Sequence, residues 1–204
     1  MRIIGLTGNI ASGKSKISEY LKTKGYKIID ADLIGKTILE EDTIKNKLVR
    51  YFGTEILNED GSINRKKLGS IVFSSKKNLE KLNRVTLPIL SKKIRKKINE
   101  YKRKKIKIVV LDAAILIEAK WNRIVDEVWV VYTNPEIQLD RLMKRENYTI
   151  DEAKNRIFAQ MDINEKLKYA DVIINNSYEW EKTKLQIDEE IERLKSYETK
   201  LLKN

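Results

Sequence analysis

A glycine-containing segment near the start of the chain, Gly8 to Ser15, follows the pattern G-x-x-x-x-G-K-S. It comes directly after a short apolar run and opens a stretch with helical spacing, the context in which this pattern, the P-loop, binds nucleotide phosphates. Glycines let backbone N–H groups turn toward the phosphates, and the helix N-terminus adds partial positive charge. We therefore expect a nucleotide site formed by Gly8, Asn9, Ile10, Ala11, Ser12, Gly13, Lys14 and Ser15, with Lys16 next to it.

Three side chains in and near this segment are suited to phosphoryl chemistry. Lys14 would reach the β and γ phosphates, and the Ser15 hydroxyl would help to hold Mg²⁺. Asp112 ends the apolar run Ile108 to Leu111, where a carboxylate would support Mg²⁺ directly or through water. The chain has neither histidine nor cysteine, which excludes thiol nucleophiles and the usual zinc ligands and leaves Mg²⁺ as the metal that suits this set.

The residues around these positions distinguish between classes of nucleotide-binding protein. Ala113 follows Asp112, whereas ATPases of the mechanical and helicase type commonly have a glutamate there to activate water. Asp32 to Gly35 matches the D-x-x-G pattern of GTPases, but no N-K-x-D sequence that would read guanine follows. The sequence therefore favours ATP as the nucleotide and a phosphotransferase over an ATPase or a GTP-dependent switch.

A pair of carboxylates, Asp30 and Asp32, closes the second apolar run, Lys27 to Asp30. Ligands of open α/β sheets gather at the carboxyl ends of the strands, where both carboxylates are expected to lie. We expect one of the pair to meet the substrate, and we favour Asp32 as the base that accepts a proton from an attacking hydroxyl. The alternative role for either residue is to cap the following helix.

Arginines are concentrated late in the chain. Arg141 and Arg145 lie four residues apart on a predicted helix, hence on one face, and Arg156 lies on the next predicted helix. Guanidinium groups there would clamp the transferring phosphoryl group and exclude water when a lid closes. The alternative is that they only solvate the helix surface.

The scaffold for these residues is indicated by short Ile- and Val-rich runs that are apolar at consecutive positions, as in a parallel sheet covered on both faces. The runs are Arg2 to Thr7, Lys27 to Asp30, Ile106 to Asp112, Glu127 to Tyr132 and Asp171 to Asn175. Helical patterns between them are clearest at Lys14 to Lys24, Leu79 to Arg103, Pro135 to Arg145 and Asp151 to Met161. The pattern predicts an α/β fold.

Other segments also have a predicted conformation. Thr149 and Glu152 fit a capping box. The segment from Tyr178 to Leu202 has apolar residues at helical intervals and is predicted to be a helix packed on the edge of the domain. Thr37 to Arg103 is a long, mostly helical insertion that would form a cap over the site.

The chain has 204 residues and a formal net charge of +12, from 42 Lys and Arg against 30 Asp and Glu, which favours anionic partners. An RNA-binding NTPase is the alternative function from another class, because Lys92 to Lys107 is strongly basic. This run alternates with Ile94, Ile98 and Tyr101 at helical spacing and has no aromatic stacking cluster, so we favour a solvated helix face. No segment approaches the length of a membrane span, and no signal peptide begins the chain. We expect a cytoplasmic protein without nucleic-acid or membrane partners.

Several segments together resemble the dephospho-coenzyme A kinase family: GLTGNIASGKS, IIDAD, RKKLGSIVF, RLMKRE and ADVIINN. The match runs through nearly the whole chain. Its most particular parts are DAD after the P-loop, the RxxLGxxVF segment at Arg65 to Phe73, and the series Gln160, Lys166, Ala170-Asp171 and Asn175. Adenylate, uridylate and guanylate kinases share only the P-loop and a general lid.

This resemblance implies a P-loop NTPase fold with a five-stranded parallel sheet flanked by helices, a helical acceptor-binding insertion and a small lid. It divides the chain into a core of residues 1–36 and 104–204, an insertion of about 37–103, and a lid of about 141–160. It implies that ATP and dephospho-coenzyme A are the substrates, that the ribose 3′-hydroxyl is phosphorylated, and that Mg²⁺ assists. We expect a monomer. A nucleoside or nucleotide kinase with another acceptor is the alternative.

Carried over by position, the resemblance makes Asp32 the general base, and Lys14 and Ser15 the phosphate and magnesium residues. It makes Arg141 and Arg145 the phosphate contacts on the lid side. Asn175 and, with it, Asn176 fall where the family approaches the ATP adenine.

The chain departs from the family pattern at a few positions. Asn9 and Ala11 replace glycines of the loop, and because alanine adopts left-handed angles poorly, Ala11 is expected to keep ordinary backbone angles. Leu87 stands where the family has histidine, and Ala114 where it has proline. Each change would alter acceptor affinity without removing a group needed for phosphoryl transfer.

Overall fold

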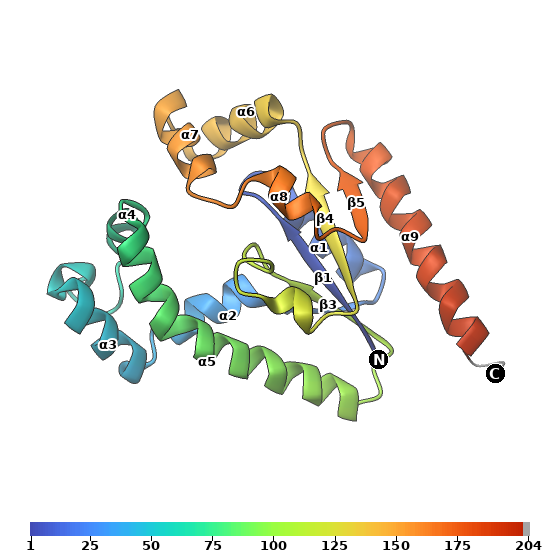
Figure 1. Cartoon of the computed structure of the whole chain (residues 1–204), viewed down its shortest axis with the longest axis horizontal. Coiled ribbons are helices and arrows are strands. Elements are labelled where there is room, and N and C mark those ends of the chain that lie inside the picture. The colour runs from blue at the N-terminus through green and yellow to red at the C-terminus, as the bar shows by residue number, and fades with distance from the viewer. Residues whose placement is uncertain (202–204) are drawn as a thin grey trace. The chain divides into compact units, whose positions relative to one another are not determined.

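The computed structural model describes residues 1–201, and their side chains through Ser196. A five-stranded parallel sheet has the strand order β2-β3-β1-β4-β5 (Figure 1). The strands are β1 Arg2–Gly8, β2 Lys27–Asp30, β3 Ile108–Asp112, β4 Glu127–Tyr132 and β5 Val172–Asn175. Every apolar run that the sequence predicted to be a strand is one, and the predicted α/β fold class is confirmed.

The chain forms two compact units. The first, here called the P-loop unit, contains Arg2–Ile28 and the residues from Val110 onward. The second, here called the helical unit, contains Met1 and Ile29–Val109.

In the P-loop unit, β1 pairs in parallel with β4, and β4 with β5, in registers that place Leu6 opposite Trp129 and Val130 opposite Ile173. Leu6, Trp129 and Val130 are fully buried, as expected for strands covered on both faces. The helices of this unit are α1 Lys14–Thr23, α6 Pro135–Glu146, α7 Ile150–Phe158, α8 Ile163–Leu167 and α9 Trp180–Leu201, with a 3₁₀ turn, η2, at Trp121–Arg123. Of the predicted terminal helix, Leu202 lies outside the described residues.

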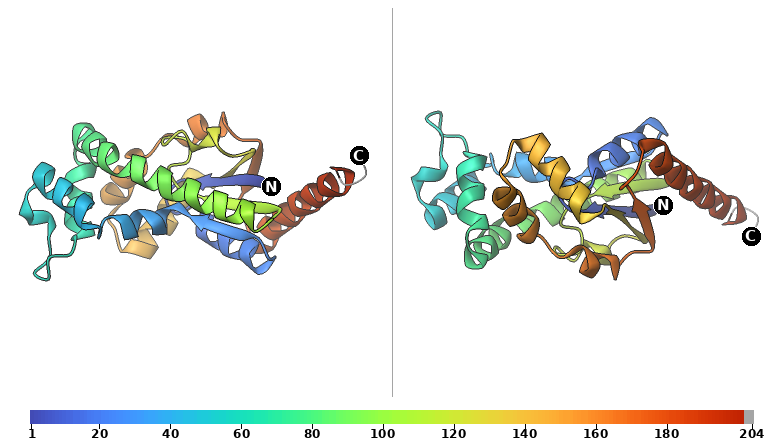
Figure 2. Two further views of the ribbon diagram at one scale, coloured as in Figure 1. Left: turned by 90° about the horizontal axis from the view of Figure 1, so that it is seen from below. Right: turned by 90° about the horizontal axis from the view of Figure 1, so that it is seen from above.

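Side chains fix the starts of these helices. Asn134 caps α6, and Pro135 stands in its first turn, where a missing N–H has no cost. The predicted capping box of α7 is confirmed, since Thr149 accepts from the Glu152 amide while the Glu152 carboxylate accepts from the Thr149 amide. Helix α9 runs alongside β5 (Figures 1 and 2) and buries Ile187, Ile191 and Leu194. The predicted edge helix is therefore present.

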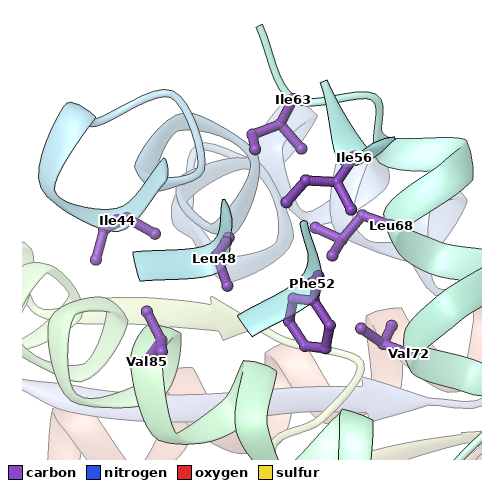
Figure 3. Close-up of a cluster of buried hydrophobic side chains, with 8 residues drawn as sticks. All are labelled: Ile44, Leu48, Phe52, Ile56, Ile63, Leu68, Val72 and Val85. Carbon is purple, nitrogen blue, oxygen red and sulfur yellow. The ribbon is translucent and has the colours of Figure 1, made fainter. Parts of the chain in front are cut away.

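The helical unit confirms the prediction of a mostly helical segment. Its elements are α2 Ala31–Ile38, α3 Asp42–Phe52, the 3₁₀ turn η1 Thr54–Ile56, α4 Arg65–Phe73 and α5 Lys76–Arg103. They pack around a separate core of Ile44, Leu48, Phe52, Ile56, Ile63, Leu68, Val72 and Val85 (Figure 3). The RxxLGxxVF segment is thus helix α4, and Leu68 and Val72 are its contribution to this core.

The basic run at the end of α5 has the expected form of a solvated helix face. Ile94 is buried and the lysines on either side of it are more exposed. Glu100 pairs with both Lys97 and Lys104. None of the described helices combines the length and the apolar character needed to cross a membrane.

Candidate active site

The P-loop leaves β1 and enters α1 with the backbone that its glycines allow. Gly13 has φ = 91°, a left-handed angle that favours glycine. A side chain at Gly13 would also collide with Asn176, whose Nδ2 lies 2.1 Å from where a Cβ atom would be. At Gly8, an added Cβ would lie 2.9 Å from the Val131 carbonyl oxygen. Both motif glycines are therefore required by the packing around the loop.

Ala11 contradicts the expectation of ordinary backbone angles. Its φ is 60°, so it adopts the left-handed conformation that a glycine would adopt more easily, at a cost of about 1–2 kcal/mol. Asn9 is not among the described residues with positive φ. The loop therefore holds Ala11 in a strained conformation, because hydrogen bonds on both sides of this residue fix the path of the backbone.

One set of hydrogen bonds holds the loop at Ser12. The Ser12 carbonyl accepts hydrogen bonds from the Thr133 hydroxyl at 3.0 Å and from the Asn176 amide at 2.7 Å. Asn176 is in turn fixed by the buried Thr183 hydroxyl, which donates to its Oδ1 at 2.9 Å. The ends of β4 and β5 and the start of α9 therefore hold the loop in place before any ligand binds.

A second set of hydrogen bonds holds the loop at Asn9 and Ile10. The Gln160 side chain accepts from the Ile10 amide at 2.7 Å, and Gln138 donates to the Ile10 carbonyl at 2.7 Å. Asn9 donates to the Met161 carbonyl at 3.0 Å. Both ends of the α6–α7 segment are thereby attached to Ile10, and the later end is also attached to Asn9.

The structure brings the predicted lysine and carboxylate together. The Lys14 ammonium forms an ion pair with Asp112, and both side chains are nearly buried. Ser15, on the first turn of α1, is exposed to solvent. Lys14, Ser15 and Asp112 therefore form the polar centre of the P-loop unit, at the carboxyl end of β3.

A buried lysine orders the chain after Asp112. Lys166 on α8 is fully buried and donates to the Ala114 carbonyl at 2.6 Å, and it pairs with Glu118 at 3.1 Å. The Thr7 hydroxyl also donates to the Ala114 carbonyl, at 3.2 Å. Ala114, which replaces the family's proline, is thus held through its carbonyl oxygen, which either residue would present.

The predicted arginines differ in their surroundings. Arg145 is exposed and pairs with Glu146 at 2.8 Å, whereas Arg141 is half-buried and, within residues 1–196, has no carboxylate within ion-pair distance. Gln138, Arg141 and Arg145 follow each other at i, i+3 and i+7, so they share one face of α6. Because Gln138 contacts the loop, this face is the one turned toward the P-loop. Arg156 lies 6.0 Å from the Tyr148 ring centroid.

Two residues expected near ATP have definite contacts. The Lys16 ammonium lies 4.2 Å from the centroid of the Trp180 ring. The Asn175 side-chain oxygen accepts from the Ser177 backbone N–H at 3.0 Å, and the Asn175 backbone N–H donates to the Gln186 side-chain oxygen at 2.8 Å. Asn175 therefore shapes the turn that follows β5.

Asp32 belongs to the helical unit. The strand ends at Asp30, and α2 begins at Ala31, so the expectation that both carboxylates lie at the end of the strand is wrong for Asp32. Asp30 caps α2 by accepting from the Leu33 amide at 2.7 Å. Asp32 is exposed on the first turn of the helix. The capping role thus falls to Asp30 and not to Asp32.

Several residues of this arrangement had no role predicted from the sequence. Gln160 and Lys166 were noted only as part of the family pattern, and Asn176 only as a neighbour of the adenine. The position of Gln138 on the helix could have been recognised from the sequence, because it precedes Arg141 by three residues and so lies on the same helix face.

Comparison with known proteins agrees with this geometry. A family model described as dephospho-CoA kinase matches residues 2–182. The dephospho-CoA kinase of Carboxydothermus hydrogenoformans is 50% identical over 186 residues, covering 91% of this chain and 90% of that protein. That of Dehalococcoides mccartyi is 42% identical over 184 residues, covering 90% and 93%.

A solved structure agrees as well. The dephospho-CoA kinase of Campylobacter jejuni superimposes with a TM-score of 0.71 at 30% identity, covering 95% of this chain and 98% of that one. The family model and these relatives cover both the P-loop and most of the rest of the chain. The chain belongs to the dephospho-CoA kinase family.

Proposed function

We propose that the chain transfers the γ-phosphoryl group of ATP to the ribose 3′-hydroxyl of dephospho-coenzyme A, giving coenzyme A and ADP, the last step of coenzyme A biosynthesis. The observation that carries this proposal is the P-loop with its Lys14–Asp112 pair in a chain that matches the family model over residues 2–182. In this role Lys14 binds the β and γ phosphates, and the loop's N–H groups surround them.

Two side chains of the P-loop unit together fit a magnesium ion. Ser15 offers an exposed hydroxyl, and Asp112 a carboxylate. Within the described part of the chain no cluster of three or more acidic side chains could hold a metal by itself. Mg²⁺ commonly uses one or two protein oxygens together with substrate phosphates and water. When bound with ATP, it neutralises charge on the phosphates, and Ser15 and Asp112 would hold it.

Asp32 is the proposed general base. An exposed carboxylate on the first turn of α2 is accessible to a substrate, and the neighbouring Asp30 already serves as the helix cap. Asp32 would accept the proton of the 3′-hydroxyl while the hydroxyl oxygen attacks the γ phosphorus. The bond between the γ phosphorus and the bridging β-phosphate oxygen breaks, and ADP leaves.

The proposed function also assigns a role to each part of the chain. We assign the core to residues 1–36 and 104–204, acceptor binding to about 37–103, and the lid to about 141–160. Arg141 and Arg145 would contact the transferring phosphoryl group from the lid, and Asn175 would lie near the adenine. A monomer that binds no nucleic acid is sufficient for this reaction.

Two substitutions test these roles. Lys14→Ala is expected to abolish phosphoryl transfer while the far-UV CD spectrum keeps its native form. Asp32→Asn is expected to lower kcat at least a hundredfold with an ATP dissociation constant within twofold of the parent. If Asp32→Asn leaves kcat within a fewfold of the parent, Asp32 is not the base.

A further inference from the structure

Helix α6 is attached to the P-loop through one buried polar side chain, that of Gln138. Its Nε2 atom donates a hydrogen bond to the Ile10 carbonyl oxygen at 2.7 Å, and Gln138 is only 6% exposed. A buried amide needs a hydrogen-bond partner to offset its lost contact with water. The bond to Ile10 therefore fixes the point at which α6 contacts the loop.

Ile10 is itself a fixed point of the loop. Its backbone N–H donates to the Gln160 side-chain oxygen at 2.7 Å. Two residues further on, the Ser12 carbonyl accepts hydrogen bonds from Thr133 and Asn176. All three of these partners lie outside α6, so the path of the backbone at Ile10 is set without this helix. A helix that binds the Ile10 carbonyl therefore takes its position from the loop.

The contact at Gln138 decides where the arginines of α6 lie. Arg141 and Arg145 follow it by three and seven residues on the same face, about 4.5 Å and about 10.5 Å further along the helix axis. Arg141 is half-buried and, within residues 1–196, has no carboxylate at ion-pair distance. Arg145 is exposed and pairs with Glu146. Arg141 is thus the arginine closer to the loop contact, and its charge is available to a phosphate.

We propose that Gln138 is a positioning residue for phosphoryl transfer: its bond to the Ile10 carbonyl sets the rotation of α6 and brings Arg141 to the phosphates bound by the P-loop. The inference rests on the proposed function, in which Arg141 contacts the transferring phosphoryl group. Gln138 acts through Arg141, because its own amide is buried and bonded to the loop. A displacement of about 1 Å can cost on the order of a hundredfold in rate, so the loss of this one bond should be measurable.

The test is a double-mutant cycle on kcat in the full-length protein. Gln138→Met keeps the length of the side chain but removes the N–H donor, and Arg141→Ala removes the guanidinium group. In the parent background, Gln138→Met should lower kcat about tenfold or more. In the Arg141→Ala background, the same substitution should lower kcat less than about twofold, because no arginine is left to be positioned.

Two further measurements separate positioning from a general loss of structure. Isothermal titration calorimetry without an acceptor should give Gln138→Met a Kd for ATP within about threefold of the parent, because the loop is still held at Ser12. Gln138→Glu also keeps the side-chain length, but it puts a carboxylate beside the Ile10 carbonyl and should lower kcat at least as much as Gln138→Met. Far-UV CD measures whether both variants keep the native helix content.

The matched control is Asp140→Asn on the same helix. Asp140 is exposed and pairs with Lys144 at 2.8 Å. Its place two residues after Gln138 puts it on the opposite side of α6. The control variant should keep both kcat and the Kd for ATP within about twofold of the parent.

The proposal is overturned if Gln138→Met leaves kcat within about twofold of the parent, or if it lowers kcat by the same factor with and without Arg141. A higher Kd for ATP with kcat unchanged would also overturn it, because Gln138 would then serve nucleotide binding alone. Failure of the proposed function is recognised in the parent protein, as phosphorylation of another acceptor or ATP hydrolysis without one. The same cycle, measured on that reaction, still decides the role of Gln138.

Discussion

The side-chain amide of Asn176 donates a 2.7 Å hydrogen bond to the carbonyl oxygen of Ser12, across 164 residues of chain. Its Nδ2 also occupies the space where a side chain at Gly13 would extend. The turn after β5 and the phosphate-binding loop are therefore packed as one unit. ATP affinity should depend on residues of that turn even where they do not contact the nucleotide.

Asn176→Ala is expected to destabilise the protein by about 1–3 kcal/mol, because the buried Thr183 hydroxyl loses its acceptor and the Ser12 carbonyl loses a donor. The KM for ATP should rise severalfold. Urea denaturation and initial-rate kinetics measure the two effects. Asn164→Ala is the control, because Asn164 is exposed and should leave both values unchanged; equal effects of the two substitutions would contradict the role of Asn176.

Ala11 gives a prediction about strain. Ala11→Gly removes the left-handed strain but increases the entropy of the unfolded chain, so the free energy of unfolding should stay the same or rise by up to about 1 kcal/mol. Ala11→Val should lower it by about 1–2 kcal/mol, since a β-branched residue tolerates φ = 60° poorly. Chemical denaturation of the three proteins measures the order. A valine variant as stable as the parent would show that the loop does not hold this angle in solution.

The arginines of α6 should differ in their contribution to catalysis. Arg141→Ala is expected to lower kcat on the order of a hundredfold or more, the scale of losing an electrostatic contact to the transferring group. Arg145→Ala should lower it less than about tenfold, because Arg145 is exposed and already paired with Glu146. Steady-state kinetics with both substrates measures these values. A larger loss of kcat for Arg145→Ala than for Arg141→Ala would contradict the prediction that Arg141 contributes more to catalysis.

The sequence predicted the sheet well because each strand is a run of consecutive apolar residues, as in Ile108 to Leu111. The P-loop was equally clear, since its spacing lies within one short segment. Lys14 and Asp112 were each predicted from the sequence to act at the phosphates or the magnesium ion, and the structure adds that they form an ion pair. Local patterns of this kind can be found without knowledge of distant contacts.

The contacts that shape the loop could not be predicted in the same way. Gln160 and Asn176 reach the loop from 150 and more residues away, and a polar side chain gives no local sign of its partner. The φ angle at Ala11 was wrongly predicted because the prediction used only alanine's own backbone preference. The hydrogen bonds that fix Ile10 and Ser12 cannot be recognised in the sequence. The role of Asp30 as the helix cap was open until the start of α2 was known.

The start of α7 should respond to acid. The backbone N–H of Thr149 donates to Glu152 and lowers the pKa of that carboxyl below its ordinary value. A pKa lowered by folding stabilises the cap above the unfolded pKa, and this stabilisation is lost as the pH falls through the folded pKa. The Thr149 amide resonance should therefore titrate in NMR with a midpoint below the ordinary glutamate range. Glu152→Gln should abolish the titration; a midpoint at or above that range would show that the capping box is not formed.

The most direct test of the account is an assay of ATP-dependent phosphorylation with Mg²⁺ that compares dephospho-coenzyme A with AMP, adenosine, other nucleosides and RNA, followed by mass spectrometry of each product. The account predicts one added phosphoryl group on dephospho-coenzyme A alone, placed on the ribose 3′-oxygen, with one ADP formed per product. Phosphorylation of another acceptor in preference to it, or ATP hydrolysis stimulated by RNA without a phosphorylated product, would contradict the assigned function.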